Sequence, residues 1–167
     1  AAMKLVWLAI DASHAHRSTA LPLIHAACAG LPDVEWQAVR ALPPAQPGAV
    51  AAEVHARHPD VLAATLYLFN RRAVQDVLLR VKALLPSCNV VVGGPECLGD
   101  NAELLRRHPY VDIVVRGEGE AAMPALLGAL LGGCVPQGIP GVSWRDEAGQ
   151  PHDDDAGPFA PGEVERL

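Results

Sequence analysis

Two apolar runs late in the chain each break into glycine beside a carboxylate. Residues 90–92 are followed by Gly93-Gly94-Pro95-Glu96, and residues 113–115 by Arg116 and then Gly117-Glu118-Gly119-Glu120. Glycine has no Cβ, so its backbone can adopt a positive φ or approach another group closely. The pattern therefore has two explanations: tight turns after two strands, or two walls of one ligand site.

Other side chains with chemical potential are sparse. Asp11, His14 and His16 follow the first apolar run, but two nearby histidines and one aspartate do not define a metal site. No two cysteines form a CxxC pair, so the spacing does not favour a zinc or iron–sulfur site. We expect ordinary reduced thiols. The cysteines are Cys28, Cys88, Cys97 and Cys134.

Composition limits the class of protein. The 167 residues suffice for one domain with a proper core, and half of them are hydrophobic. The net charge is −6 and no basic patch is present, which disfavours nucleic acid as a partner. No apolar run reaches the roughly 18 residues of a membrane span, and no secretory signal is visible. We expect a soluble, cytoplasmic protein.

The elements that must position these residues alternate between strand and helix. Short apolar runs predict five strands, at residues 4–10, 35–40, 61–66, 89–92 and 112–115. Helical segments follow within residues 18–30, 48–58, 71–86, 101–108 and 120–133, with Ser18 as a candidate N-cap of the first. Residues 142–145 begin a short C-terminal hairpin, which turns around residues 147–149.

Strands separated by helices of this length indicate a parallel sheet covered on both faces. Right-handed crossovers then give an α/β fold: a doubly wound, five-stranded parallel sheet of flavodoxin-like or Rossmann-like type, in the order 2-1-3-4-5. Ligands bind such sheets beyond the carboxyl ends of the strands. The polar or glycine-containing loops at residues 11–18, 65–72, 93–99 and 116–120 all belong to that rim. Turn residues are needed in βα loops whatever they bind, so the turn explanation stays open.

The glycine loops match neither the dinucleotide fingerprint nor the P-loop. The combination VVVGGPE (90–96) and YVDIVVRGEGE (110–120), with ATLYLFN (64–70) upstream, instead resembles the N-terminal cobalamin-binding domain of cobalamin-dependent radical S-adenosylmethionine (SAM) enzymes. The resemblance covers about residues 4–146. It implies a cobalamin-binding module of a radical SAM enzyme, possibly a methyltransferase, that is not catalytic by itself.

The resemblance also implies a set of cofactor-binding residues around the nucleotide tail of cobalamin. Residues after the third strand would line the tail channel, the first glycine loop would pass close to the ribose and phosphate, and the second would close the other side, with Glu118 as a hydroxyl acceptor. Residues of the first loop would face the corrin or its amides. The implied residues are Ser13, His14, Thr65, Leu66, Tyr67, Gly93, Gly94, Pro95, Gly117, Glu118 and Gly119.

Two family features are missing from this sequence. The DxHxxG motif that supplies an axial histidine in other cobalamin proteins is absent after the first strand, so we expect no protein ligand to the metal. The CxxxCxxC motif of a [4Fe–4S] cluster is also absent, so neither the cluster nor SAM is expected to bind this segment. Residues 1–146 are predicted to form the cobalamin-binding domain. Residues 147–167 are predicted to form the end of the hairpin and a linker toward a radical SAM domain in cis.

Two other functions remain open. The same rim could belong to a non-catalytic flavodoxin-like domain whose vestigial pocket serves domain contacts. It could also bind a flavin or another nucleotide. Neither of these alternatives requires cobalamin.

Overall fold

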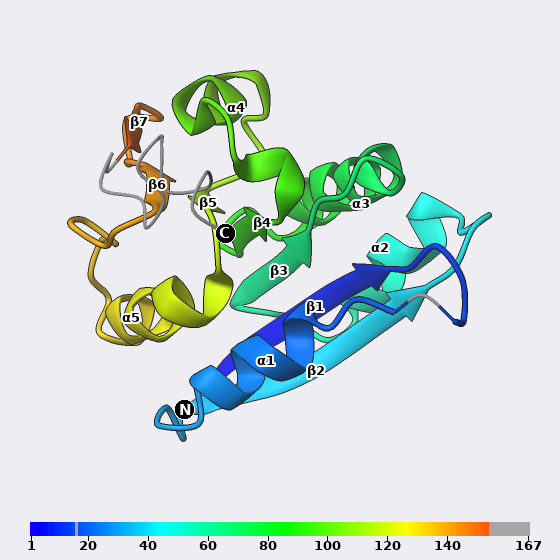
Figure 1. Ribbon diagram of the computed structural model, residues 1–167, viewed down its shortest axis with the longest axis horizontal. Coiled ribbons are helices and arrows are strands. Elements are labelled where there is room, and N and C mark those ends of the chain that lie inside the picture. Colours follow the sequence, from blue (N-terminus) through cyan, green and yellow to red (C-terminus); the bar gives the residue numbers. More distant parts are fainter. Residues whose placement is uncertain (16, 154–167) are drawn as a thin grey trace, which may run out of the picture.

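The computed structural model describes residues 1–15 and 17–153. His16 and the predicted linker residues 154–167 lie outside the described residues. Strands and helices alternate as far as β5, and a strand pair follows α5 (Figure 1). The elements are β1 (Met3–Ile10), α1 (Ala20–Ala27), β2 (Val34–Ala41), α2 (Pro47–His55), β3 (Val61–Thr65), α3 (Arg71–Leu84), β4 (Asn89–Gly93), the 3₁₀ turn η1 (Pro95–Cys97), α4 (Asn101–Arg107), β5 (Ile113–Val115), α5 (Gly119–Leu131), β6 (Val142–Arg145) and β7 (Pro151–Asp153).

The sheet confirms the predicted parallel topology. Its order is β2-β1-β3-β4-β5-β6-β7, and the first five strands pair in parallel in the predicted order 2-1-3-4-5. The long crossovers that parallel strands need are supplied by the helices between them. The carboxyl ends of β1, β3, β4 and β5 consequently meet at one rim.

The C-terminal hairpin differs in one detail from the prediction. It does not stand apart but extends the sheet, because β6 pairs antiparallel with β5 and β7 pairs antiparallel with β6, giving seven strands. The reason lies in β6 itself: Val142 and Trp144 are buried on one face and cover the edge that β5 would otherwise expose.

Each face of the sheet has its own core, since successive side chains of a strand point to opposite faces. On one face, Leu62 and Leu66 of the β3 segment pack with residues of α2, α3 and α4. On the other, Trp7 packs with residues of α1 and α5, including Ile24 and Leu126. In Figure 1, α1 crosses in front of β1 and β2. The fold is therefore doubly wound, with α1 and α5 on the face that matters for the site.

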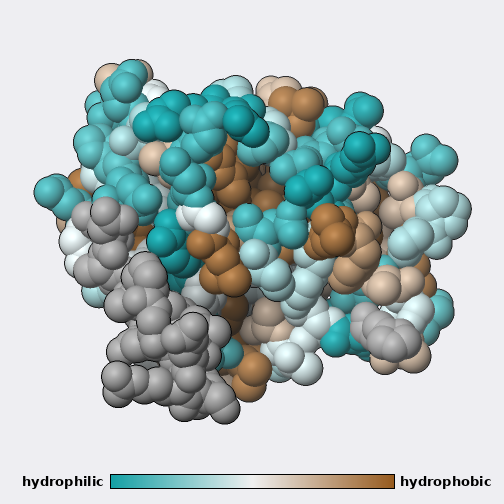
Figure 2. Space-filling view, turned by 45° about the horizontal axis from the view of Figure 1, so that its top comes forward, coloured by the Kyte–Doolittle hydropathy of each residue, from teal (hydrophilic) through white to brown (hydrophobic). Residues whose placement is uncertain are grey.

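Outer surfaces of the molecule carry few large apolar side chains. On the side shown in Figure 2, hydrophobic residues form separate patches between hydrophilic ones. Among the described residues, no helix has the length and apolar character that a membrane crossing requires.

Candidate functional site

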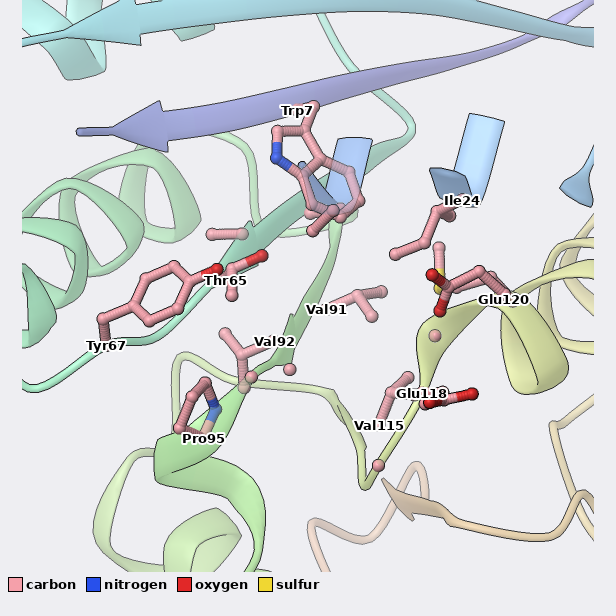
Figure 3. Close-up of a pocket in the computed structure, with 18 residues that line it drawn as sticks. Trp7, Ile24, Thr65, Tyr67, Val91, Val92, Pro95, Val115, Glu118 and Glu120 are labelled. Carbon is pink, nitrogen blue, oxygen red and sulfur yellow. The ribbon is translucent and has the colours of Figure 1, made fainter. Parts of the chain in front are cut away.

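A cavity of about 200 Å³ opens at the rim, on the α1/α5 face of the sheet. Its floor consists of the carboxyl ends of β3, β4 and β5, and Trp7 of β1 closes one end (Figure 3). Most of the lining is apolar, and its polar side chains are few: Thr65, Tyr67 and two glutamates. An apolar cleft with a small number of placed polar groups is the usual form of a small-molecule site.

Gly94, in the first glycine loop, is required by the fold itself. Its φ is +100°, and a Cβ there would lie 2.6 Å from Thr65 Cγ2 and 2.8 Å from the Leu66 carbonyl oxygen. The chain's own atoms thus already fill the space that a side chain at this position would need.

Gly119, in the second loop, allows two helices to approach. A Cβ on Gly119 would lie 2.5 Å from Ile24 Cδ1, so the absence of a side chain lets the start of α5 pack against α1. Both glycine loops also line the cavity. The two explanations offered by the sequence are thus compatible: each glycine break serves a tight local geometry, and together the breaks form two walls of one cavity.

The two glutamates of the second loop lie across the cavity from Tyr67 (Figure 3). Glu118 is the N-cap residue of α5, yet its side chain makes no capping hydrogen bond to that helix. Glu120 lies in the first turn, where a carboxylate interacts favourably with the helix dipole. Helix capping therefore does not account for the Glu118 side chain, which is exposed at the edge of the cavity, and its role as a hydroxyl acceptor stays a prediction.

Two arginines join the loops around the cavity to each other. Arg71, at the start of α3, pairs with Glu96 at 2.8 Å, so the glutamate of the first loop is used in an ion pair and does not line the cavity. Arg116 donates to the Gly99 carbonyl oxygen at 2.6 Å and thereby links the second loop to the first. The cavity walls are held by these contacts without any ligand.

Most of the residues predicted for the site line this cavity, and their role in binding stays a prediction. Leu66 does not: it is 2% exposed and packs in the core on the opposite face. The alternation of side chains along β3 explains the error, because Thr65 points toward the cavity and its neighbour must point away. The predicted residues that line the cavity are Thr65, Tyr67, Gly93, Gly94, Pro95, Gly117, Glu118 and Gly119.

Ser13 and His14 of the first rim loop are not among the residues that line the cavity. His14 lines a second hollow together with Asp11, Arg17 and Arg40. The buried Asp11 carboxylate accepts hydrogen bonds from Arg40 Nη1 and from the Ser18 backbone N–H, each at 3.3 Å. The loop reaches the cavity wall at its last residue, where Ser18 Oγ lies 2.9 Å from the Tyr67 hydroxyl. Contacts of Ser13 and His14 with a ligand stay predictions.

Sequence reasoning missed the apolar part of the lining. The strand residues could have been found from the alternation of side chains along a strand, since residues two apart share a face of the sheet. Moving back two residues from Thr65 and Gly93 gives Ala63 and Val91, which both line the cavity. The helix residues could not be found in this way, because helix-to-sheet docking decides which of them reach the rim. The missed lining residues, all apolar except Glu120, are Trp7, Ala20, Ile24, Ala63, Ala64, Val91, Val92, Val115, Glu120 and Met123. The side chains of Ala64 and Val92 pack in the core of the opposite face.

The thiols do not form a metal site within the described residues. No group of three potential metal ligands is found there, and all four cysteines are unpaired. Burial raises the pKa of Cys97, which follows the first glycine loop, to about 12. Such a thiol stays protonated and is a poor metal ligand.

The fold and the cavity define a flavodoxin-like domain with a ligand site at the carboxyl rim of its sheet. Residues 19–127, which make up more than half of the chain, match the profile of the family described as "B12 binding domain". The chain belongs to this family, and it is a cobalamin-binding module.

Relatives of known name support the assignment. The chain is 40% identical over 88 residues to the cobalamin-dependent radical SAM methyltransferase TokK of Streptomyces tokunonensis, a match covering 52% of this chain and 13% of that protein. It is also 40% identical over 106 residues to the 2-(S-pantetheinyl)-carbapenam-3-carboxylate methyltransferase of Streptantibioticus cattleyicolor, covering 63% of this chain and 15% of the relative. The chain thus matches only a small part of each relative's length.

A solved structure shares the fold. The cobalamin-dependent SAM radical enzyme OxsB, with aqua-cobalamin and SAM bound, superposes with a TM-score of 0.73 over 95% of this chain and 23% of that enzyme, at 11% sequence identity. At this identity the likeness concerns the fold alone.

The cavity residues fit one part of cobalamin. A volume of about 200 Å³ is below the range of about 300–1,000 Å³ that is typical of pockets enclosing a whole drug-sized ligand. It is too small for a corrin macrocycle and suited to one flat aromatic base. The apolar walls match such a base, and the Glu118 carboxylate is suited to a ribose hydroxyl.

Proposed function

We propose that this domain binds cobalamin for a radical SAM methyltransferase, with the dimethylbenzimidazole tail in the rim cavity and the corrin outside it. The single observation that carries the proposal is the cavity itself, which lies between the two glycine loops that the resemblance assigns to the tail. Cobalamin would supply methyl-group chemistry when bound. This chain's residues would hold the cofactor and keep water from its base.

The remaining parts of the proposed enzyme lie beyond the aligned segment. The two methyltransferases matched by this chain are much longer than it, which supports a radical SAM domain in cis that binds SAM and a [4Fe–4S] cluster. Substrate contacts are assigned to that domain. We place the enzyme in the cytoplasm, where the three buried free thiols, Cys28, Cys88 and Cys97, would stay reduced.

The lining of the cavity disfavours any ligand whose phosphate would lie at the second glycine loop. The flavin or nucleotide alternative stays open at the first glycine loop, where the phosphate of the cobalamin tail is also expected. Two carboxylates line it, and neither lysine nor arginine does. Phosphate groups are usually held by cations or by helix N-termini free of nearby negative charge. With Glu118 and Glu120 at the start of α5, a phosphate at that helix terminus would be repelled.

The contacts of Asp11 support the expected absence of an axial histidine. This carboxylate, which could orient the His14 ring, accepts hydrogen bonds from Arg40 and Ser18 instead. A metal-bound imidazole is normally oriented by such a partner. We therefore expect cobalamin to bind with its own base detached and with no histidine on the lower face.

The proposed function is tested with hydroxocobalamin. Stoichiometric binding with an altered visible spectrum is expected, together with the spectrum of a detached base. Electron paramagnetic resonance of the reduced cofactor should show no three-line nitrogen splitting, and His14→Ala should leave that spectrum unchanged. Absence of binding would refute the function. Nitrogen splitting that disappears in His14→Ala would refute only the expectation that no histidine binds the lower face of the cofactor.

A further inference from the structure

The segment between β3 and α3 carries Tyr67, the aromatic side chain that forms one wall of the cavity (Figure 3). Residues 66–70 belong to neither element, and Leu68 and Phe69 within them are exposed by 76% and 58%. A loop with such exposed side chains gains little order from packing. The position of Tyr67 must therefore be fixed by specific contacts.

Asn70 supplies those contacts to the backbone. Its Oδ1 accepts a hydrogen bond from the Tyr67 N–H at 2.9 Å. Its Nδ2 donates to the carbonyl oxygens of Ile10, at 3.1 Å, and Thr65, at 3.3 Å. One buried carboxamide, 4% exposed, thus connects the ends of β1 and β3 to the turn that carries Tyr67.

The position of Asn70 in the helix makes these contacts informative. It is the N-cap residue of α3, where asparagine normally accepts a hydrogen bond from a backbone N–H of the first helical turn. Its side chain makes no such bond here. The carboxamide stabilises the rim instead of the helix, and both of its donor hydrogens and its acceptor oxygen are used.

A second contact fixes the other end of the Tyr67 side chain. Its hydroxyl lies 2.9 Å from Ser18 Oγ, and Ser18 is tied to Asp11 through its backbone N–H. This serine was expected to cap α1. It lies one residue before the N-cap, Thr19, but its hydroxyl accepts a hydrogen bond from the N–H of Ala20, the first residue of α1, at 3.3 Å. The same hydroxyl thus connects the start of α1 to the wall of the cavity. Tyr67 is held by Asn70 at its backbone and by Ser18 at its hydroxyl.

We propose that Asn70 is a positioning residue for the nucleotide tail of cobalamin, acting through Tyr67. Asn70 does not line the cavity, so it would not touch the ligand. The loss of its carboxamide removes the hydrogen bond to the Tyr67 N–H and the ties to the ends of β1 and β3. The turn then keeps the backbone hydrogen bonds from residues 70 and 71 to the Tyr67 carbonyl oxygen, and the ring is positioned less firmly on the wall. This inference rests on the proposed function, because it requires that the cavity hold the tail.

The test compares cobalamin with cobinamide, which has the corrin ring and lacks the nucleotide tail. Asn70→Ala should weaken cobalamin binding about tenfold, corresponding to about 1.4 kcal/mol, and should change cobinamide binding less than twofold. A general loss of structure would weaken both. The matched control is Ser143→Ala, which also removes a buried polar side chain. Ser143 donates a hydrogen bond to Asp153 between β6 and β7, away from the cavity. This variant should change neither the cobalamin nor the cobinamide affinity.

A double-variant experiment tests the route through Tyr67. In a Tyr67→Ala background, Asn70→Ala should cause no further loss of cobalamin affinity, because the side chain that it positions is gone. If Asn70→Ala does not fold, Asn70→Asp is measured in its place. This variant has the same shape, keeps the acceptor and loses both donors. It should show the same selective loss: weaker binding of cobalamin and unchanged binding of cobinamide.

Each outcome decides the question. Equal losses for cobalamin and cobinamide, additive losses in the Tyr67→Ala background, or wild-type affinity in the variants would overturn the role of Asn70. If the wild-type protein bound neither ligand, the proposed function would fail before the variants are compared. The failures of the two proposals are therefore distinguishable.

Discussion

Replacing Gly94 by alanine separates the structural role of the first glycine loop from its role in binding. In the structure, Gly94 has φ +100° and ψ −175°, a region that is almost restricted to glycine. The added Cβ would meet Thr65 Cγ2 at 2.6 Å and two backbone atoms of Leu66, its carbonyl oxygen at 2.8 Å and its nitrogen at 3.1 Å. Backbone atoms of a strand end cannot move aside as the tip of a side chain can.

The expected loss of stability has two parts. Holding a non-glycine residue in this backbone region costs about 1–3 kcal/mol. Overpacking against Thr65 and Leu66 costs about 1–3 kcal/mol more. For Gly94→Ala we expect a total of about 2–6 kcal/mol, which for a domain of this size lowers Tm by about 4–24 °C at about 2–4 °C per kcal/mol.

Thermal and urea unfolding of the ligand-free protein, followed by circular dichroism, measure this loss. Ligand must be absent because binding raises the apparent stability. Gly99→Ala is the matched control: a Cβ at Gly99 would have no neighbour within 4 Å, so stability should change by at most about 0.5 kcal/mol. If Gly94→Ala were as stable as wild type and lost only cobalamin affinity, the glycine would be needed for the ligand, and the steric reasoning would be wrong.

Three further predictions concern packing, thiols and pH. Gly119→Ala should lower stability by about 1 kcal/mol because its Cβ would meet Ile24 Cδ1 at 2.5 Å; in a urea-unfolding cycle, adding Ile24→Val should recover part of that loss, and additive effects would contradict the contact. Ellman's reagent should label Cys134 alone in the folded protein and all four cysteines after denaturation, because the other three are buried. The hydrogen bond with His152, at 2.7 Å, lowers the pKa of Asp146 below its ordinary value of 3.8. The contribution of Asp146 to stability is therefore present above pH 3.8 and is lost as the pH falls through the lowered pKa. Asp146→Asn should therefore lower Tm near neutral pH and not in strong acid, and a pH-independent difference would refute this assignment.

Much of the fold could be predicted because its signals are local. Short apolar runs, separated by segments with helical periodicity, predicted five strands in the correct order, with boundaries off by at most one residue. The attachment of the hairpin could not be predicted in the same way. Whether Val142 and Trp144 cover the edge of β5 or form a separate unit depends on long-range pairing, which leaves no mark in the spacing of a four-residue strand.

The site was less predictable than the fold because it depends on which way each side chain points. The rim rule placed both glycine loops correctly, but it does not distinguish Thr65 from Leu66, whose directions follow from the register of β3. Nor could the sequence show that Asn70 leaves its own helix uncapped. The Asn70 side chain turns away from the helix because its Nδ2 donates to the Ile10 carbonyl oxygen at 3.1 Å. Ile10 lies 60 residues earlier in the chain, so no local pattern reveals this contact.

The cavity is costly to the fold, and this bears on the vestigial alternative. An unfilled apolar volume costs about 24 cal/mol per Å³, or about 5 kcal/mol at most for about 200 Å³, and less here because the mouth is open to water. A small side chain on the floor, Ala63, leaves much of this space, and each methylene added there would recover about 0.8 kcal/mol by burial. A pocket without a ligand gains stability from every such substitution and would be expected to fill. Ala63 keeps the space open at a cost that bound ligand can offset, which favours a cavity in use over a vestigial one.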